Sequence, residues 1–539
     1  MNRTDDDESL MTALSIACVE FDHKVTVKHN AELYFGAVGV LAHKLVTVDS
    51  RKHDVIRMIC AAMEMTMRGG SKYVKEAYLV NSRDIMPPFL ELVEKAEHSK
   101  IRYADEVILN ISKCFHYLSR VPSLQLSLAR QPGFLDFLQR VATAPLNVAC
   151  RNTRTRVLAN LASAEENKVL MFFHKGLFSS LLKIAQMDSI DSTREYASIA
   201  LVQLASSPAN QIPMIKSGYV LQIISTMVVS EKVTSIRENV TTVLQTLAFL
   251  KSSRKRMVEY NDGMVVEALC HQMQQDESEK ARRRAAGTLT NLVSAETAEQ
   301  LADPKLLNLL RELASNDSNA DVQERACLVL TKIASCISPS SPFHDAIITA
   351  LIVVAHTDVD NNVAAVFRLK ARDAKDRYRL ARYPGVLDAL GRLCVKPKAT
   401  LEDLDNATRA LMHLSNENEN RKIMCIESVL DALSMGASCS YNLPDRPPNT
   451  TLADTDETDK ELLMSEIQNS AVRALARLAT EEANRPVMAK HQGLLTAIAK
   501  ATEKEAKEQQ QQREPNASPT NQKKDFLAKP LLLIMLLAL

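Results

Sequence analysis

Arginine recurs at regular intervals in the middle of this sequence, in a setting suited to carboxylate binding. Four consecutive copies of one pattern carry it, at Arg151, Arg194, Arg237 and Arg282. A guanidinium group presents a planar fork of donors that matches a carboxylate. One interpretation is a row of arginines that clamps an extended, partly acidic peptide. The alternative is that each arginine pairs with an acid of a neighbouring copy and stabilises the packing between copies.

Side-chain amides follow nine residues after three of these arginines and form a second candidate set. They are Asn160, Gln203 and Asn291, and Asn110 lies in a similar setting upstream. An amide both donates and accepts hydrogen bonds, so a row of amides suits the backbone of an extended segment. Together the arginines and amides are our candidate partner-binding residues.

Signs of other chemistry are absent from the sequence. There is no GxSxG, HExxH, Walker or GxGxxG motif. His356, Asp358 and Asp360 lie close together, but their spacing matches no known set of metal ligands. We therefore expect a protein that is not an enzyme, with no catalytic residues, no cofactor and no metal site.

The elements that position these residues are copies of one repeat. We call the amide position the zero position. Its counterparts in the other copies are Thr246, Lys332, Leu369, His413 and Arg477. Apolar residues stand two positions before and one position after most zero positions, and an alanine often stands six before. These offsets fall on one face of a helix, so they predict a buried stripe that packs against the next copy.

A glycine stands about sixteen residues after several zero positions, as at Gly176, Gly218 and Gly385. A left-handed glycine can end one helix and let the next begin at an angle. Each copy is thus predicted to contain a short helix, a turn and two longer helices. One such unit cannot bury its apolar face alone, so the copies must stack.

The pattern resembles the armadillo repeat. The resemblance rests on arginine, alanine, Leu-x-Asn-Leu-Ala, asparagine and glycine in RNTRTRVLANLASAEENKVLMFFHKG and STREYASIALVQLASSPANQIPMIKSG. It implies an all-α, right-handed superhelical α-solenoid of about nine to eleven units. In peptide-binding members similar to importin alpha, the zero-position asparagine binds ligand backbone. The tryptophan that such members place four residues earlier is missing here, which argues against a receptor for nuclear localisation signals.

The chain divides into four predicted regions. Residues 1–100 form an atypical helical cap, residues 101–502 hold the repeats, residues 503–525 are a disordered linker, and residues 526–539 are a hydrophobic tail. Residues 440–461 are a predicted disordered insertion, rich in Pro, Thr and Asp. The Ser/Pro-rich stretch 335–346 and Lys370, which stands where leucine is expected, mark the least regular repeat.

Composition narrows the range of partners and compartments. Aromatic residues make up 4% of the chain, tryptophan is absent and the net charge is +1, so nucleic acid is not an expected partner. The ten cysteines form no CxxC pair and lie mostly in apolar stretches, which is typical of buried free thiols. The N-terminus has no signal-peptide pattern. We expect a cytoplasmic protein, with a nuclear location open and secretion excluded.

The function that these patterns favour is a protein-binding scaffold or adaptor, which the resemblance implies would hold a partner segment in a concave groove. A first alternative is a membrane-proximal adaptor attached through Phe526 to Leu539, although the nine apolar residues of Leu531 to Leu539 are too few to span a bilayer. A second alternative is a chaperone or a small-GTPase exchange-type regulator. Nothing in the sequence indicates an oligomeric state.

Overall fold

The structure is a computed structural model of the chain. It describes residues 45, 53–69, 82–98, 103–142, 147–357, 362–395, 399–439 and 454–499. All the regular elements in this part of the chain are helices. The predicted linker 503–525 and tail 526–539 lie outside the described residues, as does most of the predicted N-terminal cap.

One complete copy of the repeat runs from Glu165 to Ser206. It consists of α10 (Glu165–Phe173), α11 (Leu177–Met187) and α12 (Asp191–Ser206), which confirms the predicted order of a short helix and two longer ones. Gly176 separates the first two helices with a φ of 77°, which glycine adopts without steric cost. At Gly218 the prediction was wrong: φ is not positive, and a Cβ there would lie 3.0 Å from the ring of Tyr260.

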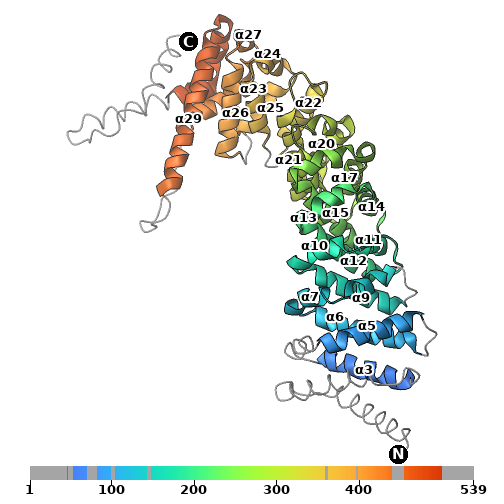
Figure 1. The fold of residues 1–539 in the computed structure, drawn as a ribbon. Coiled ribbons are helices and arrows are strands. Elements are labelled where there is room, and N and C mark those ends of the chain that lie inside the picture. Colours follow the sequence, from blue (N-terminus) through green and yellow to red (C-terminus); the bar gives the residue numbers. More distant parts are fainter. Residues whose placement is uncertain are drawn as a thin grey trace, which may run out of the picture. The chain divides into compact units, whose positions relative to one another are not determined.

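The first of two compact units comprises the residues up to Gln272. Five of its helices pack one against the next and form a row (Figure 1). They are α3 (His53–Gly69), α6 (Ala104–Ser119), α9 (Val148–Ala162), α12 and α15 (Thr234–Phe249). The other elements are α5 (Ser82–His98), α7 (Pro122–Ala129), α8 (Phe134–Gln139), η1 (Arg140–Ala142), α10, α11, α13 (Pro208–Lys216), α14 (Gly218–Ser230), η2 (Lys251–Ser253), α16 (Arg254–Glu259), η3 (Tyr260–Gly263) and α17 (Met264–Gln275), which carries the unit boundary.

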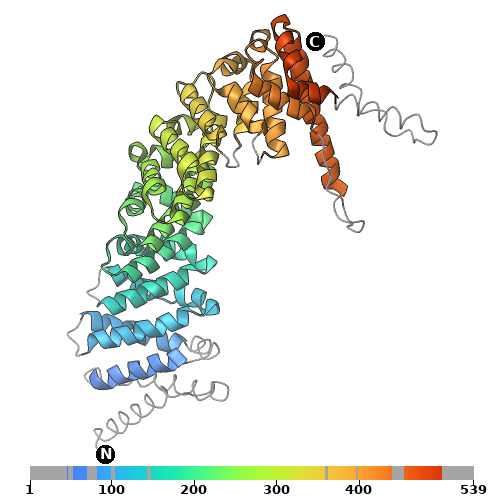
Figure 2. The same ribbon diagram turned by 180° about the vertical axis from the view of Figure 1, so that it is seen from behind.

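The second unit begins at Met273 and repeats this arrangement (Figure 2). Its row consists of α18 (Glu279–Leu292), α21 (Ala320–Cys336), α23 (Val363–Arg372), α26 (Leu401–Leu414) and α29 (Asp454–Ala479). The other elements are α19 (Ala298–Leu301), α20 (Pro304–Asn316), α22 (His344–Ala355), α24 (Ala374–Arg382), α25 (Val386–Val395), α27 (Asn418–Arg421), α28 (Glu427–Ala437), η4 (Glu482–Asn484) and α30 (Arg485–Lys490). We call the helices of the two rows the long helices.

The core of both units consists of the apolar stripe that the sequence predicts. In α12 the residues two before and one after the zero position, Leu201 and Leu204, are at most 1% exposed. The alanines six before it, such as Ala285 and Ala407, are fully buried. Small residues at this position let neighbouring backbones approach, while the branched side chains fill the space between helices.

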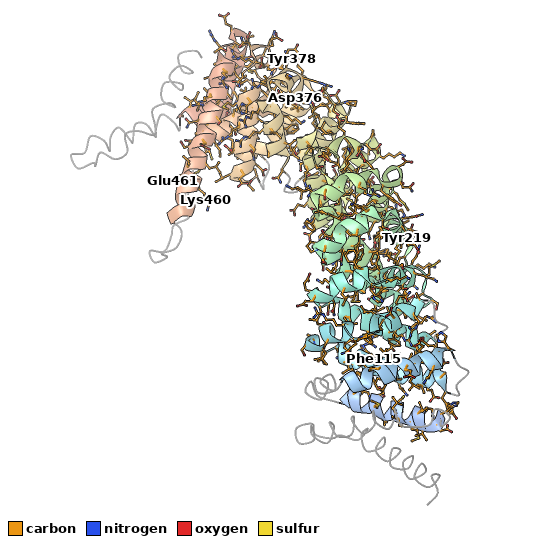
Figure 3. All side chains as sticks on the ribbon, viewed as in Figure 1. Phe115, Tyr219, Asp376, Tyr378, Lys460 and Glu461 are labelled. Atoms are coloured by element: carbon orange, nitrogen blue, oxygen red, sulfur yellow. The ribbon has the colours of Figure 1, made fainter. Side chains whose placement is uncertain are left out.

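The first repeats share a core of aromatic rings. Phe115 of α6 lies at its centre (Figure 3), with ring centroids 4.8 Å from Phe134 and 5.5 Å from Phe137. The guanidinium of Arg154, which is fully buried, stacks on the ring of Phe137 at 4.0 Å and bonds to Glu97 of α5 at 2.7 Å. This buried ion pair joins the helix α5 to the first regular repeats.

The irregular repeat lacks its short helix. After α21 ends at Cys336 the chain turns through the Ser/Pro-rich residues and enters α22 directly at His344. Lys370 occupies a buried position where the other copies have leucine, and its Nζ donates to the backbone oxygen of Ile337 in this turn. Burial lowers the pKa of Lys370, and the nearby Asp376 and Asp373 oppose that shift. The lysine thus replaces an apolar contact with a cap on the turn.

The predicted insertion 440–461 was partly wrong. Residues 454–461 are helical, because α29 begins at Asp454 and runs for 26 residues. Five acidic residues within the first eight of this helix explain its start, since negative charge is favourable near a helix N-terminus. Residues 440–453 lie outside the described part of the chain.

Candidate partner-binding surface

The zero positions form an exposed row on the long helices of each unit. In the first unit Asn160, Gln203 and Thr246 are half-buried, although the residue that follows each of them is inside the core, namely Leu161, Leu204 and Leu247. In the second unit Asn291, Lys332, Leu369, His413 and Arg477 are half-buried or exposed. Each of these long helices therefore offers a partly accessible side chain at an equivalent place, next to buried residues of the core.

Asn110 is not part of this row, so its predicted equivalence to Asn160 was wrong. The helix α6 ends at Ser119, whereas α9 ends two residues after Asn160. Asn160 donates to the Oγ of Ser119, 41 residues earlier, and Arg154 contacts Ser112, 42 residues earlier. The ends of the two helices therefore place Tyr117, two residues before the end of α6 and two helical turns beyond Asn110, at the zero position of α6. Burial and Glu64 raise the pKa of Tyr117 to about 12.

The zero-position side chains differ in how far the packing already uses them. Lys332 donates to the backbone oxygen of Thr290, and Arg477 donates to that of Met412 at 3.0 Å. Among the described residues, the side-chain amides of Gln203 and Asn291 have no hydrogen-bond partner. These two amides are available to a ligand.

The four candidate arginines are bound within the packing instead. Arg194 makes a two-pronged contact with Glu231, with Nε and Nη2 each 3.0 Å from a carboxylate oxygen. Its Nη1 also donates to the backbone oxygen of Asp188 at 3.0 Å. Arg194 lies near the start of α12, and Glu231 follows α14, just before α15. The contact therefore joins two consecutive repeats.

An ion pair of the same kind recurs at two of the other three candidate arginines. Arg151 bonds to Asp188 at 2.9 Å, and Arg282 bonds to Asp317 at 3.1 Å. Arg237 donates to the backbone oxygens of Glu231 and Lys232. We call this arrangement the arginine–acid clasp. These contacts are the ones that the alternative interpretation describes, in which the arginines stabilise the packing between copies.

The acids of the clasp are buried, and their charge is stabilised locally. Burial alone would raise the pKa of Glu231, but hydrogen bonds from Arg194 and from the backbone N–H of Val233 outweigh it and hold that pKa below its usual value. The side chains of Arg194 and Glu231 are 14% and 7% exposed. A ligand carboxylate would have to displace Glu231 to reach this guanidinium.

A second repeated contact was missed at the level of sequence. A buried asparagine seven residues after the zero position donates through Nδ2 to two backbone oxygens. Asn210 bonds in this way to Leu204 at 2.9 Å and, in the preceding repeat, to Lys168 at 3.0 Å. Asn167, Asn420 and Asn484 make equivalent pairs of bonds. The asparagine of the repeat pattern was the available signal, but its role depends on carbonyl groups that no pattern shows.

Two further features bear on the chemistry of the described residues. No group of three or more His, Cys, Asp or Glu side chains in this part of the chain has a geometry that could hold a metal ion. Within the same residues no single helix is long and apolar enough to cross a membrane, and α13 with α14, bent by 91°, meet that criterion only as a pair.

Comparison with known proteins places the fold. No protein-family model matches the chain, and no curated protein matches it. A solved structure from work on a phosphorylation switch that controls the interaction between cadherin and beta-catenin matches over 99% of this chain and 98% of that chain. It is 12% identical, with a TM-score of 0.52. At this identity the match shows the fold alone: the chain has an armadillo-like fold, an all-α solenoid.

Designed proteins also match. A designed armadillo repeat protein in complex with the peptide (KR)4 is 17% identical and covers 47% of this chain and 94% of that chain, with a TM-score of 0.33. An engineered protein is 18% identical over 93% of this chain and 98% of that chain, with a TM-score of 0.46. Both TM-scores are below 0.5, so neither match adds to the argument.

Proposed function

We propose that this protein is a non-enzymatic scaffold that binds an extended segment of a partner protein along the zero-position row of a unit. The observation that carries the proposal is the recurrence of a partly accessible side chain at the equivalent place on successive long helices, beside the buried stripe. The free amides of Gln203 and Asn291 can pair with ligand backbone in two directions, because each both donates and accepts. Several such contacts, each small, add up along an extended ligand.

The candidate partner-binding residues named from the sequence include arginines that the structure shows to be already paired. Arg194 is occupied by its ion pair in the arginine–acid clasp. The clasp joins consecutive repeats and so makes the array more rigid. A rigid surface loses little conformational entropy when a ligand binds, and this favours affinity.

Site-specific photo-crosslinking in the full chain tests the proposal. A photoreactive amino acid at Gln203 lies on the row, whereas one at Tyr219 of α14, which is 57% exposed, lies off it (Figure 3). We expect position 203 to crosslink to one partner polypeptide at a defined segment and position 219 not to do so. Crosslinking of the same polypeptides at both positions would contradict binding along the row.

A further inference from the structure

Arginines gather on the last three long helices of the second unit. The helices α23, α26 and α29 pack in succession, and α24 and α27 lie beside them. The arginines are Arg368 and Arg372 on α23, Arg377 on α24, Arg409 on α26, Arg421 on α27, and Arg473 and Arg477 on α29. His413, the zero position of α26, lies among them.

Three of these arginines are neutralised by carboxylates. Arg368 bonds to Asp405 at 3.2 Å, and Arg409 contacts both Asp405 and Glu466. Arg377 bonds to Glu417 at 3.4 Å. The acids therefore neutralise the charge of these three arginines and leave the other four without a counter-charge in the described part of the chain.

The remaining four arginines have no carboxylate partner among the described residues. Arg421 donates to the backbone oxygen of Ser415 and to the hydroxyl of Thr480, and Arg477 donates to a backbone oxygen. Arg372 and Arg473 are exposed and make no side-chain bond within the part of the chain that the structure describes. We call Arg372, Arg421, Arg473, Arg477 and His413 the basic surface.

The mutual repulsion in this group is visible at its centre. The pKa of His413 is lowered by partial burial and then by the charges of Arg377, Arg368, Arg372 and Arg477. The pKa of Arg477 is lowered by partial burial and then by Arg421, Arg473 and Arg377. No acid offsets either shift. Like charges held together without counter-charges are unfavourable in the free protein, and a bound anion relieves that repulsion.

We propose that the basic surface binds an acidic polypeptide segment, rich in aspartate or glutamate. This inference rests on the proposed function and gives the chemistry of the ligand at one end of the zero-position row. Guanidinium groups on neighbouring helices present forked donors to successive carboxylates. His413 and Arg477 are themselves zero positions, so a segment that follows the row meets the basic surface.

A polypeptide fits this surface better than a nucleic acid does. The only Phe, Tyr or Trp in the described residues of α23, α26 and α29 is Phe367, which is fully buried, and Arg382 already stacks on the exposed ring of Tyr378 in α24 at 3.6 Å, so the site is poor in rings that could stack on bases. The carboxylates of Asp405, Glu417 and Glu466 also stand among the arginines. They would repel a phosphate chain that carries charge at every unit, whereas a peptide can place neutral residues opposite them.

The test is a binding titration of the full chain with a labelled peptide of alternating glutamate and serine. Fluorescence anisotropy would compare it with a peptide in which glutamine replaces glutamate. We expect Arg372→Glu and Arg473→Glu each to weaken binding at least about tenfold, because like charges brought together oppose association. The matched control is Arg392→Glu on α25, an exposed arginine that also has no partner among the described residues, and it should leave affinity within about twofold.

A second readout reports the local charge and not the fold. Bound carboxylates favour the protonated imidazole, so the pKa of His413 should rise when the acidic peptide is added. Histidine-labelled NMR follows this shift, with His413→Gln assigning the signal. The neutral peptide should leave it unchanged.

Three results would overturn the inference. They are equal affinity for the acidic and neutral peptides, an equal loss in the Arg392→Glu control, and tighter binding of a single-stranded oligonucleotide that the same two reversals abolish. Each result leaves the proposed function standing if Gln203 still crosslinks to a partner segment. Loss of that crosslink specificity, with acidic-peptide binding intact, would instead count against the zero-position row.

Discussion

Arg194→Ala removes a side chain that the structure places between two repeats. It deletes both bonds to Glu231 and one to a backbone oxygen, and leaves a 7%-exposed carboxylate without its cation. Removing one partner of a buried ion pair costs about 3–5 kcal/mol. Glu231 keeps the backbone N–H of Val233 as a donor, so we expect the lower end, about 3 kcal/mol. The contact to Asp191, which is 70% exposed, should add nothing measurable.

The measurement is native-state hydrogen exchange on the full chain, because a long repeat array need not unfold in one step. Protection should fall in α12, α14 and α15, on both sides of the clasp. A double-mutant cycle with Glu231→Gln should give a coupling of about 1–3 kcal/mol, since the second change removes the charge that the first one orphans. Arg283→Ala is the matched control: its pair with Asp321 is 46% and 59% exposed, and its loss should cost less than about 0.5 kcal/mol.

The stability that Glu231 contributes should also depend on pH. The pKa of Glu231 is lower in the folded protein than its ordinary value of 4.5, so the unfolded chain binds more protons between the two values. The contribution of Glu231 is therefore fully present above pH 4.5 and disappears as the pH falls through the folded pKa. Glu231→Gln should accordingly differ most from the parent protein near neutral pH.

One outcome would refute this reasoning. If Arg194→Ala leaves exchange in α12 and α15 unchanged but abolishes partner crosslinking at Gln203, then the arginine acts on the ligand. The clasp would then be incidental, and the clamp interpretation of the arginine row would be restored.

Three further predictions concern packing. Asn210→Ala should cost about 2–3 kcal/mol in the same exchange measurement, because it removes two buried hydrogen bonds to backbone oxygens, and no change would contradict the role of this asparagine. Gly391→Ala should cost about 1–3 kcal/mol in urea unfolding, since the new Cβ would meet the backbone oxygen of Ser428 at 2.6 Å; an unchanged midpoint would show that α25 and α28 are not packed so closely. Burial raises the pKa of Cys60 and Cys394 to about 12, so both should react with a thiol reagent at pH 8 only after unfolding; reaction as fast as that of a free thiol would contradict their burial.

The sequence predicts the buried parts of this fold well. Leu201 and Leu204 lie in the core because burial follows helical periodicity, and periodicity is visible in any single copy. The same periodicity misled the assignment of Asn110. A shift of seven residues is two helical turns, so VILNIS and the correct segment around Tyr117 present the same apolar pattern on one helix. Only the helix ends and the contacts between repeats distinguish them.

The sites depend on partners that lie far apart in sequence. Arg151 and Arg194 meet their acids 37 residues later and Arg282 meets its acid 35 later, a spacing that could have been noticed beside the arginine repeat. The basic surface gives no comparable signal. Its residues come from four helices, only His413 and Arg477 share an offset within the repeat, and its unbalanced charge becomes apparent only after the paired arginines are set aside.

The asparagine contact also shows where this chain tolerates additional residues. Asn210 reaches a carbonyl 42 residues earlier, whereas Asn484 reaches the equivalent carbonyl of Arg421 across 63 residues. The contact geometry is the same, so the additional sequence is accommodated in the connection after α28 and in the longer N-terminal part of α29, without a change in register. Length can thus be added at this connection at a small entropic cost. We expect this connection to accept a whole inserted domain, which makes it a natural place to attach a reporter and a route by which such a chain can acquire new parts.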